Sequence, residues 1–171
     1  RSLFFSGTAA ILAALWGTPI AMVLTLEDFR GKSVVKGLFN TLIGMPTVAL
    51  GLILFLILSK AGPLGFLGLL YTPGAIILGE AVLVTPLVAS IATSAIEAVD
   101  PEMMNLAKTL GASHSQASIA VLKEAVNGII FSNVAGFNRA IAALGVALLV
   151  GGNIAGLTDV MTPDISMYTN R

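Results

Sequence analysis

The sequence predicts an all-α membrane protein, a bundle of about four transmembrane helices with a polar elbow between the third and the fourth. Hydrophobic residues make up 56% of the 171 residues and charged residues only 11%, against about 25% charged in soluble proteins. Four apolar segments reach the roughly 20 residues that a membrane-spanning helix needs. The elbow is the amphipathic polar interval 97–124. We treat residues 1–171 as a single transmembrane domain.

The four predicted spans cover about residues 3–26, 37–58, 73–96 and 125–150. The first three contain one interior proline each: Pro19, Pro46 and Pro86 in that order. An interior proline costs a soluble helix about 3 kcal/mol, but in a membrane bundle neighbouring helices and waters satisfy the carbonyl groups that it frees. All four segments are therefore predicted to span, which makes the protein multi-pass.

Basic residues predict the orientation of these spans. The first connection and the elbow carry five of them, Arg30, Lys32 and Lys36, then Lys108 and Lys123. The connection 59–72 carries only Lys60. Because basic loops stay in the cytoplasm, the elbow is predicted to be cytoplasmic. The N-terminus and the tail after Gly151, which is too polar to span, are then predicted to lie outside.

The elbow is predicted to consist of two short helices that meet at a glycine. Asp100 is a good N-cap, and Pro101 then takes the first helical position. Gly111 suits the left-handed conformation that ends a helix. Ser113 and Gln116 have the three-residue spacing of a capping box, which starts the second helix.

One face of the first elbow helix is predicted to be apolar. The residues at positions i, i+3, i+4 and i+7 of this face are Met103, Leu106, Ala107 and Leu110. An amphipathic helix between membrane spans is suited to bind a partner in the water. The elbow is therefore the first candidate functional site.

The sequence offers no constellation for catalysis, cofactor binding or metal binding. It has no cysteine, and its single histidine, His114, lies among serines in the elbow, so neither thiol chemistry nor a His-paired nucleophile is predicted. Gly31-Lys32-Ser33 resembles the end of a phosphate-binding loop, but Leu26 stands where that loop needs a glycine. If the protein uses ATP, another chain must bind it. The net charge of zero gives no reason to expect nucleic acid as a partner.

Two ionisable residues, Glu80 and Arg139, lie within predicted spans. Each costs about 2.5–3.5 kcal/mol at a helix centre, so both are expected to avoid lipid. One interpretation places them along a polar pathway, and another gives them a structural role. A specific hypothesis is that they form an intramembrane pair between the third and fourth spans.

Residues 105–113 of the elbow read N-L-A-K-T-L-G-A-S. This stretch resembles the EAA motif of the permease subunits of ABC importers, most closely those for tungstate and molybdate. The core of that motif reads E-A-A-x-x-x-G-A-S. Four positions match and two differ: Ala107, Gly111, Ala112 and Ser113 match, and Asn105 and Leu106 replace the glutamate and an alanine.

The resemblance to these permeases extends from about residue 2 to residue 158. Further similar stretches are residues 40–42, 44–46, 62–65, 136–141 and 151–154. After the stretch 136–141, the family pattern continues to a glutamate four residues after Arg139. This chain has Ala143 at that position. Without that i, i+4 partner, Glu80 becomes a more attractive partner for Arg139.

The resemblance implies a type I ABC importer permease in the cell membrane of a prokaryote. Two copies would form the translocation path, a separate P-loop ATPase that binds ATP would dock on each elbow, and an extracytoplasmic oxyanion-binding protein would deliver the cargo. The family has a further span after the tail, so we expect the chain to be incomplete at its C-terminus. The residues expected to couple to the ATPase are Asn105, Leu106, Ala107, Leu110, Gly111, Ala112 and Ser113.

Two other interpretations stay open. In a secondary transporter or channel, Glu80 and Arg139 would form an ion or proton relay, although the amphipathic elbow would then have no explained role. A degenerate permease would act as a membrane anchor, which the missing motif glutamate and missing final span favour.

Overall fold

The computed structural model describes residues 2–154 and 158, and every regular element in this part of the chain is a helix. The predicted all-α fold is thereby confirmed. Beyond residue 154 the predicted tail lies outside the described residues, except for Thr158. The helices in chain order are α1 (Ser2–Leu26), α2 (Lys32–Ile43), α3 (Thr47–Leu58), the short 3-10 helix η1 (Gly65–Leu67), α4 (Pro73–Glu97), α5 (Pro101–Thr109), α6 (His114–Glu124), α7 (Val126–Ile141) and α8 (Leu144–Gly151).

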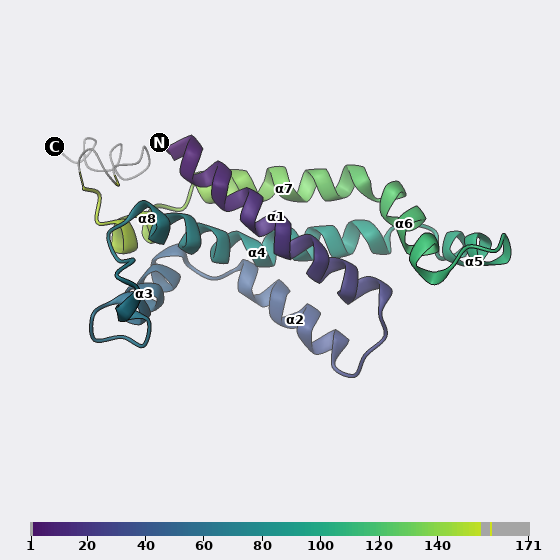
Figure 1. Cartoon of the computed structure of the whole chain (residues 1–171), viewed down its shortest axis with the longest axis horizontal. Coiled ribbons are helices and arrows are strands. Elements are labelled where there is room, and N and C mark those ends of the chain that lie inside the picture. The colour runs from purple at the N-terminus through teal and green to yellow at the C-terminus, as the bar shows by residue number, and fades with distance from the viewer. Residues whose placement is uncertain (1, 155–157, 159–171) are drawn as a thin grey trace.

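Helices α1, α4 and α7 form the body of the molecule: α4 and α7 run along its long axis, and α1 crosses obliquely and packs against both (Figure 1). Small residues bring their backbones close together. A Cβ atom added to Gly136 of α7 would lie 2.7 Å from the Val88 side chain on α4, and one added to Gly128 would lie 2.4 Å from Cβ of Ala95. Close packing through small residues is how helices associate in membranes, where lipid is as apolar as the protein surface.

Helices α1 and α4 are each 25 residues long and apolar enough to cross a membrane. Each contains its proline, Pro19 or Pro86, without a break. Beside the second proline, the indole nitrogen of Trp16 on α1 donates a hydrogen bond to the hydroxyl of Thr85 on α4. The predicted spans 3–26 and 73–96 are thus single helices, held against each other by small side chains and by this polar contact.

The predicted span 37–58 is not one continuous helix, although the two helices that form it are together apolar enough to count as one bent span. The segment forms α2 and α3, which meet at an angle of 104°. Helix α2 ends at Gly44, and Pro46, with φ −62° and ψ 133°, precedes the first turn of α3. Proline has no N–H group to donate and disfavours a helical conformation at the residue before it, so Met45 and Pro46 separate the two helices.

The predicted span 125–150 is also divided. Helix α7 ends at Ile141, and α8 starts at residue 144 after the break at Ala142 and Ala143. Helix α7 has 16 residues, fewer than the roughly 20 that a span needs. It continues from α6 through Ala125 with a bend of 62°, so α6 and α7 together provide the length that the sequence analysis assigned to α7 and α8.

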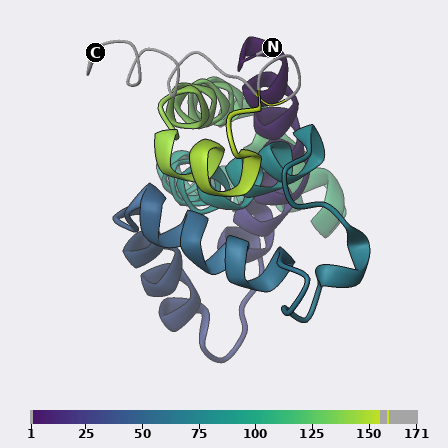
Figure 2. The same cartoon turned by 90° about the vertical axis from the view of Figure 1, so that its left-hand side faces the viewer.

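Helices α3 and α8 pack against each other across one end of the bundle, which faces the viewer in Figure 2. Two glycines make the contact possible. A Cβ atom on Gly145 would lie 2.5 Å from the backbone nitrogen of Val48, and one on Gly51 would lie 2.7 Å from the carbonyl oxygen of Gly145. Val146 and Val150 of α8 continue this contact into a buried apolar cluster. We call this part of the molecule the α3–α8 end.

The elbow lies at the opposite end of the long axis from α3 and α8 (Figure 1). The basic connection between α1 and α2 lies near it, because Glu27 lines the same hollow as His114 and Ser118 of α6. The structure therefore gathers the basic connection and the elbow at one end of the bundle, as the predicted orientation requires. We call this part the elbow end.

Candidate functional site

The first elbow helix, α5, begins and ends as the sequence predicts. Oδ1 of Asp100 accepts a hydrogen bond from the backbone N–H of Glu102 at 2.9 Å, and Pro101 is the first helical residue. After the helix, Gly111 adopts φ +89°, and the N–H of Ala112 donates to the carbonyl of Ala107 at 3.0 Å. The left-handed glycine thus turns the chain sharply between the two elbow helices.

The second elbow helix, α6, begins with the predicted capping box. The side chain of Ser113 accepts from the N–H of Gln116 at 3.3 Å, and Oε1 of Gln116 accepts from the N–H of Ser113 at 2.9 Å. Two backbone donors that would otherwise lack partners at this helix start are therefore satisfied. Both elbow helices are fixed by local hydrogen bonds, so the geometry of the tip between them does not depend on a partner protein.

The apolar stripe of α5 remains largely in solvent. The side chain of Leu106 is 61% exposed and that of Leu110 is 80% exposed. Met104, which does not belong to the stripe, is the residue of α5 that packs against the buried cluster of Ile96 and Val121. Around Gly111, no described atom lies within 4 Å of the position that a Cβ would take. The tip of the elbow therefore presents unused apolar surface beside open space.

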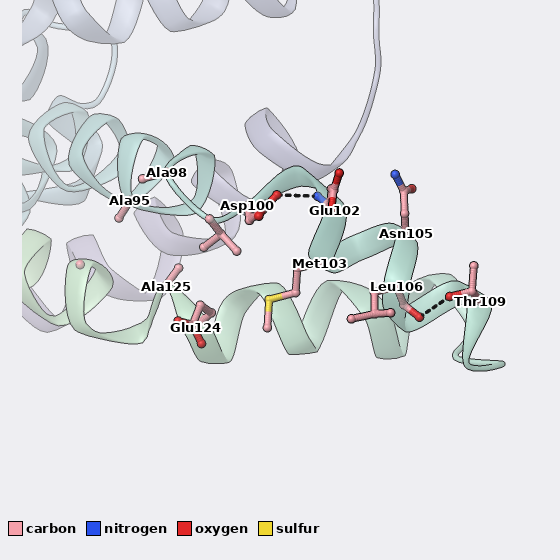
Figure 3. A pocket seen from close by; sticks show the side chains of 12 residues that line it. Ala95, Ala98, Asp100, Glu102, Met103, Asn105, Leu106, Thr109, Glu124 and Ala125 are labelled. Carbon is pink, nitrogen blue, oxygen red and sulfur yellow. Dashed lines mark hydrogen bonds between the residues drawn. The ribbon is translucent and has the colours of Figure 1, made fainter.

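The residues that the sequence predicts to couple to an ATPase all lie at or near this tip. Their side chains are exposed or half-buried, and none is in the core. Figure 3 shows Met103 and Leu106 on one wall of an open hollow of about 990 Å³, with Glu124 and Ala125 on the other side. The coupling residues are Asn105, Leu106, Ala107, Leu110, Gly111, Ala112 and Ser113.

Glu80 is buried in the seam between α4 and α1. Its carboxylate is hydrogen-bonded to the side chain of Ser6 on α1. The other carboxylate atom, Oε2, has no hydrogen-bond partner among the described residues. A carboxylate in this setting requires polar neighbours or a proton, because the surrounding helices offer little else to satisfy it.

Arg139 lies on α7 and reaches the break between α2 and α3. Its Nη2 atom donates to the carbonyl oxygens of Ile43 and Met45, both at 3.4 Å. The last carbonyls of a helix lack an intrahelical donor, and the break at Pro46 leaves these groups free to accept. Arg139 therefore serves to satisfy backbone groups at the break.

The predicted pair of Glu80 and Arg139 is not formed. No ion pair joins them within residues 2–154. The reason is that Glu80 is engaged by α1, whereas Arg139 is drawn to the carbonyls that the α2–α3 break exposes. In a continuous second span the carbonyls of Ile43 and Met45 would be bonded within the helix, so no acceptor for the arginine could be predicted there.

One ion pair at the elbow end escaped the sequence analysis. Nζ of Lys36 on α2 donates to Oε1 of Glu97, the last residue of α4. The two residues are 61 positions apart, so no local pattern connects them. The available signal was that each residue stands directly beside the boundary of a predicted span.

Comparison with known proteins places this architecture in a family. Over residues 6–171 the chain matches the family described as binding-protein-dependent transport system inner membrane component. The chain belongs to this family. Its members are the membrane components of ABC transporters, which are not enzymes themselves because the ATPase is a separate subunit. The all-helical fold, with two to four candidate spans, agrees with this membership.

Curated relatives are permease proteins for anions. The chain is 39% identical over 153 residues to a probable anion ABC transporter permease protein of Haloferax volcanii, which covers 90% of the chain and 66% of that protein. It is 37% identical over 169 residues to the tungstate uptake system permease protein of Peptoclostridium acidaminophilum, covering 99% and 74%. Against the tungstate uptake system permease protein of Campylobacter jejuni the identity is 35% over 170 residues, covering 99% and 71%. The chain thus spans about two thirds to three quarters of these relatives.

Proposed function

We propose that this chain is the transmembrane subunit of an ATP-driven importer for tungstate or a related tetrahedral oxyanion, located in the cell membrane of a prokaryote. The observation that carries the proposal is an unpacked apolar tip on the elbow of a chain 37% identical to a tungstate permease. A second copy of the permease would complete the path, and an extracytoplasmic binding protein would deliver the anion. ATP would be bound by a partner chain.

The proposed contact with the ATPase uses the exposed end of α5. Leu110 and Leu106 offer apolar side chains that the permease itself does not bury. Gly111 has no side chain and Ala112 has only a methyl group, so a partner's backbone can approach closely. Each Leu that becomes fully buried in a partner's groove stabilises the complex by about 1.5–3 kcal/mol before the costs of association. This is enough for a specific but reversible contact.

Motion of the elbow would be transmitted through the helices on both of its sides. Helix α4 leads into α5, and α6 leads into α7 through Ala125 alone. Because α4 and α7 pack closely at Ala95 and Gly128, a displacement of the elbow would carry the two helices together. Transport is coupled to ATP only to the extent that the ATPase binds two arrangements of these helices differently.

The test replaces the elbow glycine and a matched glycine at the other side of the molecule. Gly111 and Gly68 both adopt positive φ, and a Cβ at either position meets no described atom within 4 Å. Gly111→Trp and Gly68→Trp therefore introduce the same bulk, each at a glycine with positive φ and open surroundings. We expect the first to abolish ATP-dependent tungstate uptake and ATPase co-purification, and the second to preserve both, with equal insertion into the membrane.

Uptake that survives Gly111→Trp with normal recovery of the ATPase would refute the coupling role. Uptake that is abolished by a proton uncoupler but insensitive to ATP depletion would identify a secondary transporter. Retained ATPase binding without any uptake in the unmodified protein would identify a membrane anchor.

A further inference from the structure

A small polar pocket lies between α2 and α4 at the elbow end, separate from the tip of the elbow. Its volume is about 60 Å³, which is the space of about four water molecules on the same measure. A compact anion with four oxygen atoms is of this size. The polar residues that line the pocket are Lys36, Asn40, Ser90, Thr93, Ser94 and Glu97.

Two hydroxyl groups in this pocket have no partner. Thr93 is only 6% exposed, and neither its Oγ1 atom nor Oγ of Ser90 makes a hydrogen bond among the described residues. Serine and threonine in apolar helices usually donate to the carbonyl four residues earlier. Thr85 of the same helix does so at 2.7 Å to Ala81. Ser90 and Thr93 instead keep donors available toward the pocket.

The pocket also holds a cation whose present partner is easily displaced. The Lys36 side chain is 24% exposed, whereas the side chain of its partner Glu97 is 46% exposed. Glu97 is the final residue of α4, so its carboxylate can turn into water at little cost. Lys36 would then face the pocket with no opposing charge.

We propose that this pocket is a binding subsite for a tetrahedral oxyanion group. The Lys36 ammonium supplies the charge, and the hydroxyls of Ser90 and Thr93 with the amide of Asn40 supply hydrogen bonds. The anion displaces the Glu97 carboxylate from Lys36. Charge-assisted hydrogen bonds of this kind are about twice as strong as neutral ones, which offsets the loss of the exposed ion pair.

This inference rests on the proposed function, because the imported anion is the oxyanion that reaches the inner end of the bundle. The position of the subsite links anion binding to the elbow that would contact the ATPase. Glu97 stands three residues before the N-cap Asp100 of the elbow, and Lys36 belongs to α2. An anion bound at Lys36 therefore releases the ion pair that ties α2 to the root of the elbow.

The test measures tungstate binding to the purified permease–ATPase complex in nanodiscs of phosphatidylcholine, by equilibrium dialysis with detection of tungsten by mass spectrometry. Lys36→Gln and Thr93→Val should each weaken binding about tenfold or more, since each removes a donor to a charged group. Glu97→Gln should tighten binding severalfold, since it removes the competing carboxylate. Lys36→Arg should retain binding, and Lys123→Gln, an exposed elbow lysine outside the pocket, should change nothing.

The opposite signs at positions 36 and 97 separate a binding site from a merely structural ion pair. If Lys36→Gln and Glu97→Gln weaken binding equally, or if neither changes it, the subsite is refuted. Failure of the proposed function has a different signature, since no ATPase would co-purify with the unmodified chain and no uptake would occur. Nitrate, which is planar, should not compete for the site.

A lipid phosphate carries the same chemistry as a free oxyanion. Nanodiscs that contain phosphatidic acid distinguish the two sources. Tungstate binding that is unchanged by phosphatidic acid assigns the pocket to the free anion. If phosphatidic acid competes with tungstate in the unmodified protein, and this competition disappears in Lys36→Gln, the pocket is assigned to a lipid headgroup.

Discussion

The two ends of the molecule use their apolar and small residues in opposite ways. At the α3–α8 end, Gly51 and Gly145 let two short helices touch through their backbones, and Val146 is fully buried beside them. At the elbow end, α5 and α6 are equally short and well capped, but Leu106 and Leu110 remain mostly in solvent. The α3–α8 end is joined by a close backbone contact within the chain, whereas the elbow carries exposed leucines on a short helix that also bears Glu102 and Lys108.

The difference between the two ends indicates where a partner protein binds. A helix terminus that is satisfied by its own caps needs no further protein to fold, so exposed leucines at such a site are available for binding. At the opposite end, exposed apolar residues such as Val48 and Leu52 belong to α3, which together with α2 is apolar enough to lie in the membrane. The following four predictions are ordered by the size of the effect on this comparison.

The largest effect is expected from Gly145→Ala at the α3–α8 end. The new methyl group would lie 2.5 Å from the backbone nitrogen of Val48, and backbone cannot move aside as a flexible side chain can. We expect a loss of about 2–3 kcal/mol in unfolding free energy, seen as a lower Tm in detergent. Gly37→Ala is the matched control, since nothing lies within 4 Å of that site. Equal Tm changes in the two variants would contradict the glycine contact.

The next effect is expected at the elbow tip, in binding rather than stability. Leu110→Ala should weaken the affinity for the ATPase by about 1–2 kcal/mol and leave the Tm unchanged. Phe66→Ala is the control, because the side chain of Phe66 is 81% exposed, as much as that of Leu110, but lies in η1. Titration of labelled ATPase against nanodisc-embedded permease measures the affinity of each variant. A similar loss of affinity in Phe66→Ala would show that the contact is not localised to the elbow.

A smaller effect is expected from the cap that shapes the tip. Ser113→Ala removes the acceptor for the N–H of Gln116 and should cost about 1 kcal/mol in local stability. Hydrogen exchange in the first turn of α6 should then become faster. Ser118→Ala, which removes a hydroxyl bonded to the carbonyl of His114 and no cap, should have little effect. Equal exchange in the two variants would argue against a capping role.

We expect almost no energetic coupling between Glu80 and Arg139. The two side chains share no partner, since one bonds Ser6 and the other bonds Ile43 and Met45. In a double-mutant cycle, Glu80→Gln and Arg139→Gln should therefore be additive within about 0.5 kcal/mol. A coupling of several kcal/mol would restore the intramembrane pair that the structure does not contain.

Much of the fold follows from local sequence signals. The caps of α5 and α6 are encoded by residues within three or four positions of each helix end, such as Asp100 and Ser113. Helices α1 and α4 follow from apolar runs of sufficient length. The EAA-like stretch predicted the family, because it lies in a segment whose shape is set locally.

The helix breaks were not predictable in the same way. Pro19 and Pro86 lie inside intact helices, whereas Pro46 separates two, so the residue type alone does not decide. The second break, at Ala142 and Ala143, itself contains no proline or glycine. The contact of Gly145 with Val48 joins the segments that follow the two breaks, and contacts between distant segments leave no local pattern. The acceptors of Arg139 were missed for the same reason.

Site-specific photo-crosslinking is the most direct way to determine whether the elbow tip binds a separate ATPase. A benzophenone amino acid at position 110, and in a second variant at position 66, is irradiated in native membranes, and the crosslinked proteins are identified by mass spectrometry. We expect a crosslink from position 110 to a P-loop ATPase, and none to it from position 66. Crosslinks from Leu110 to lipid alone, with the permease intact in the membrane, would contradict it.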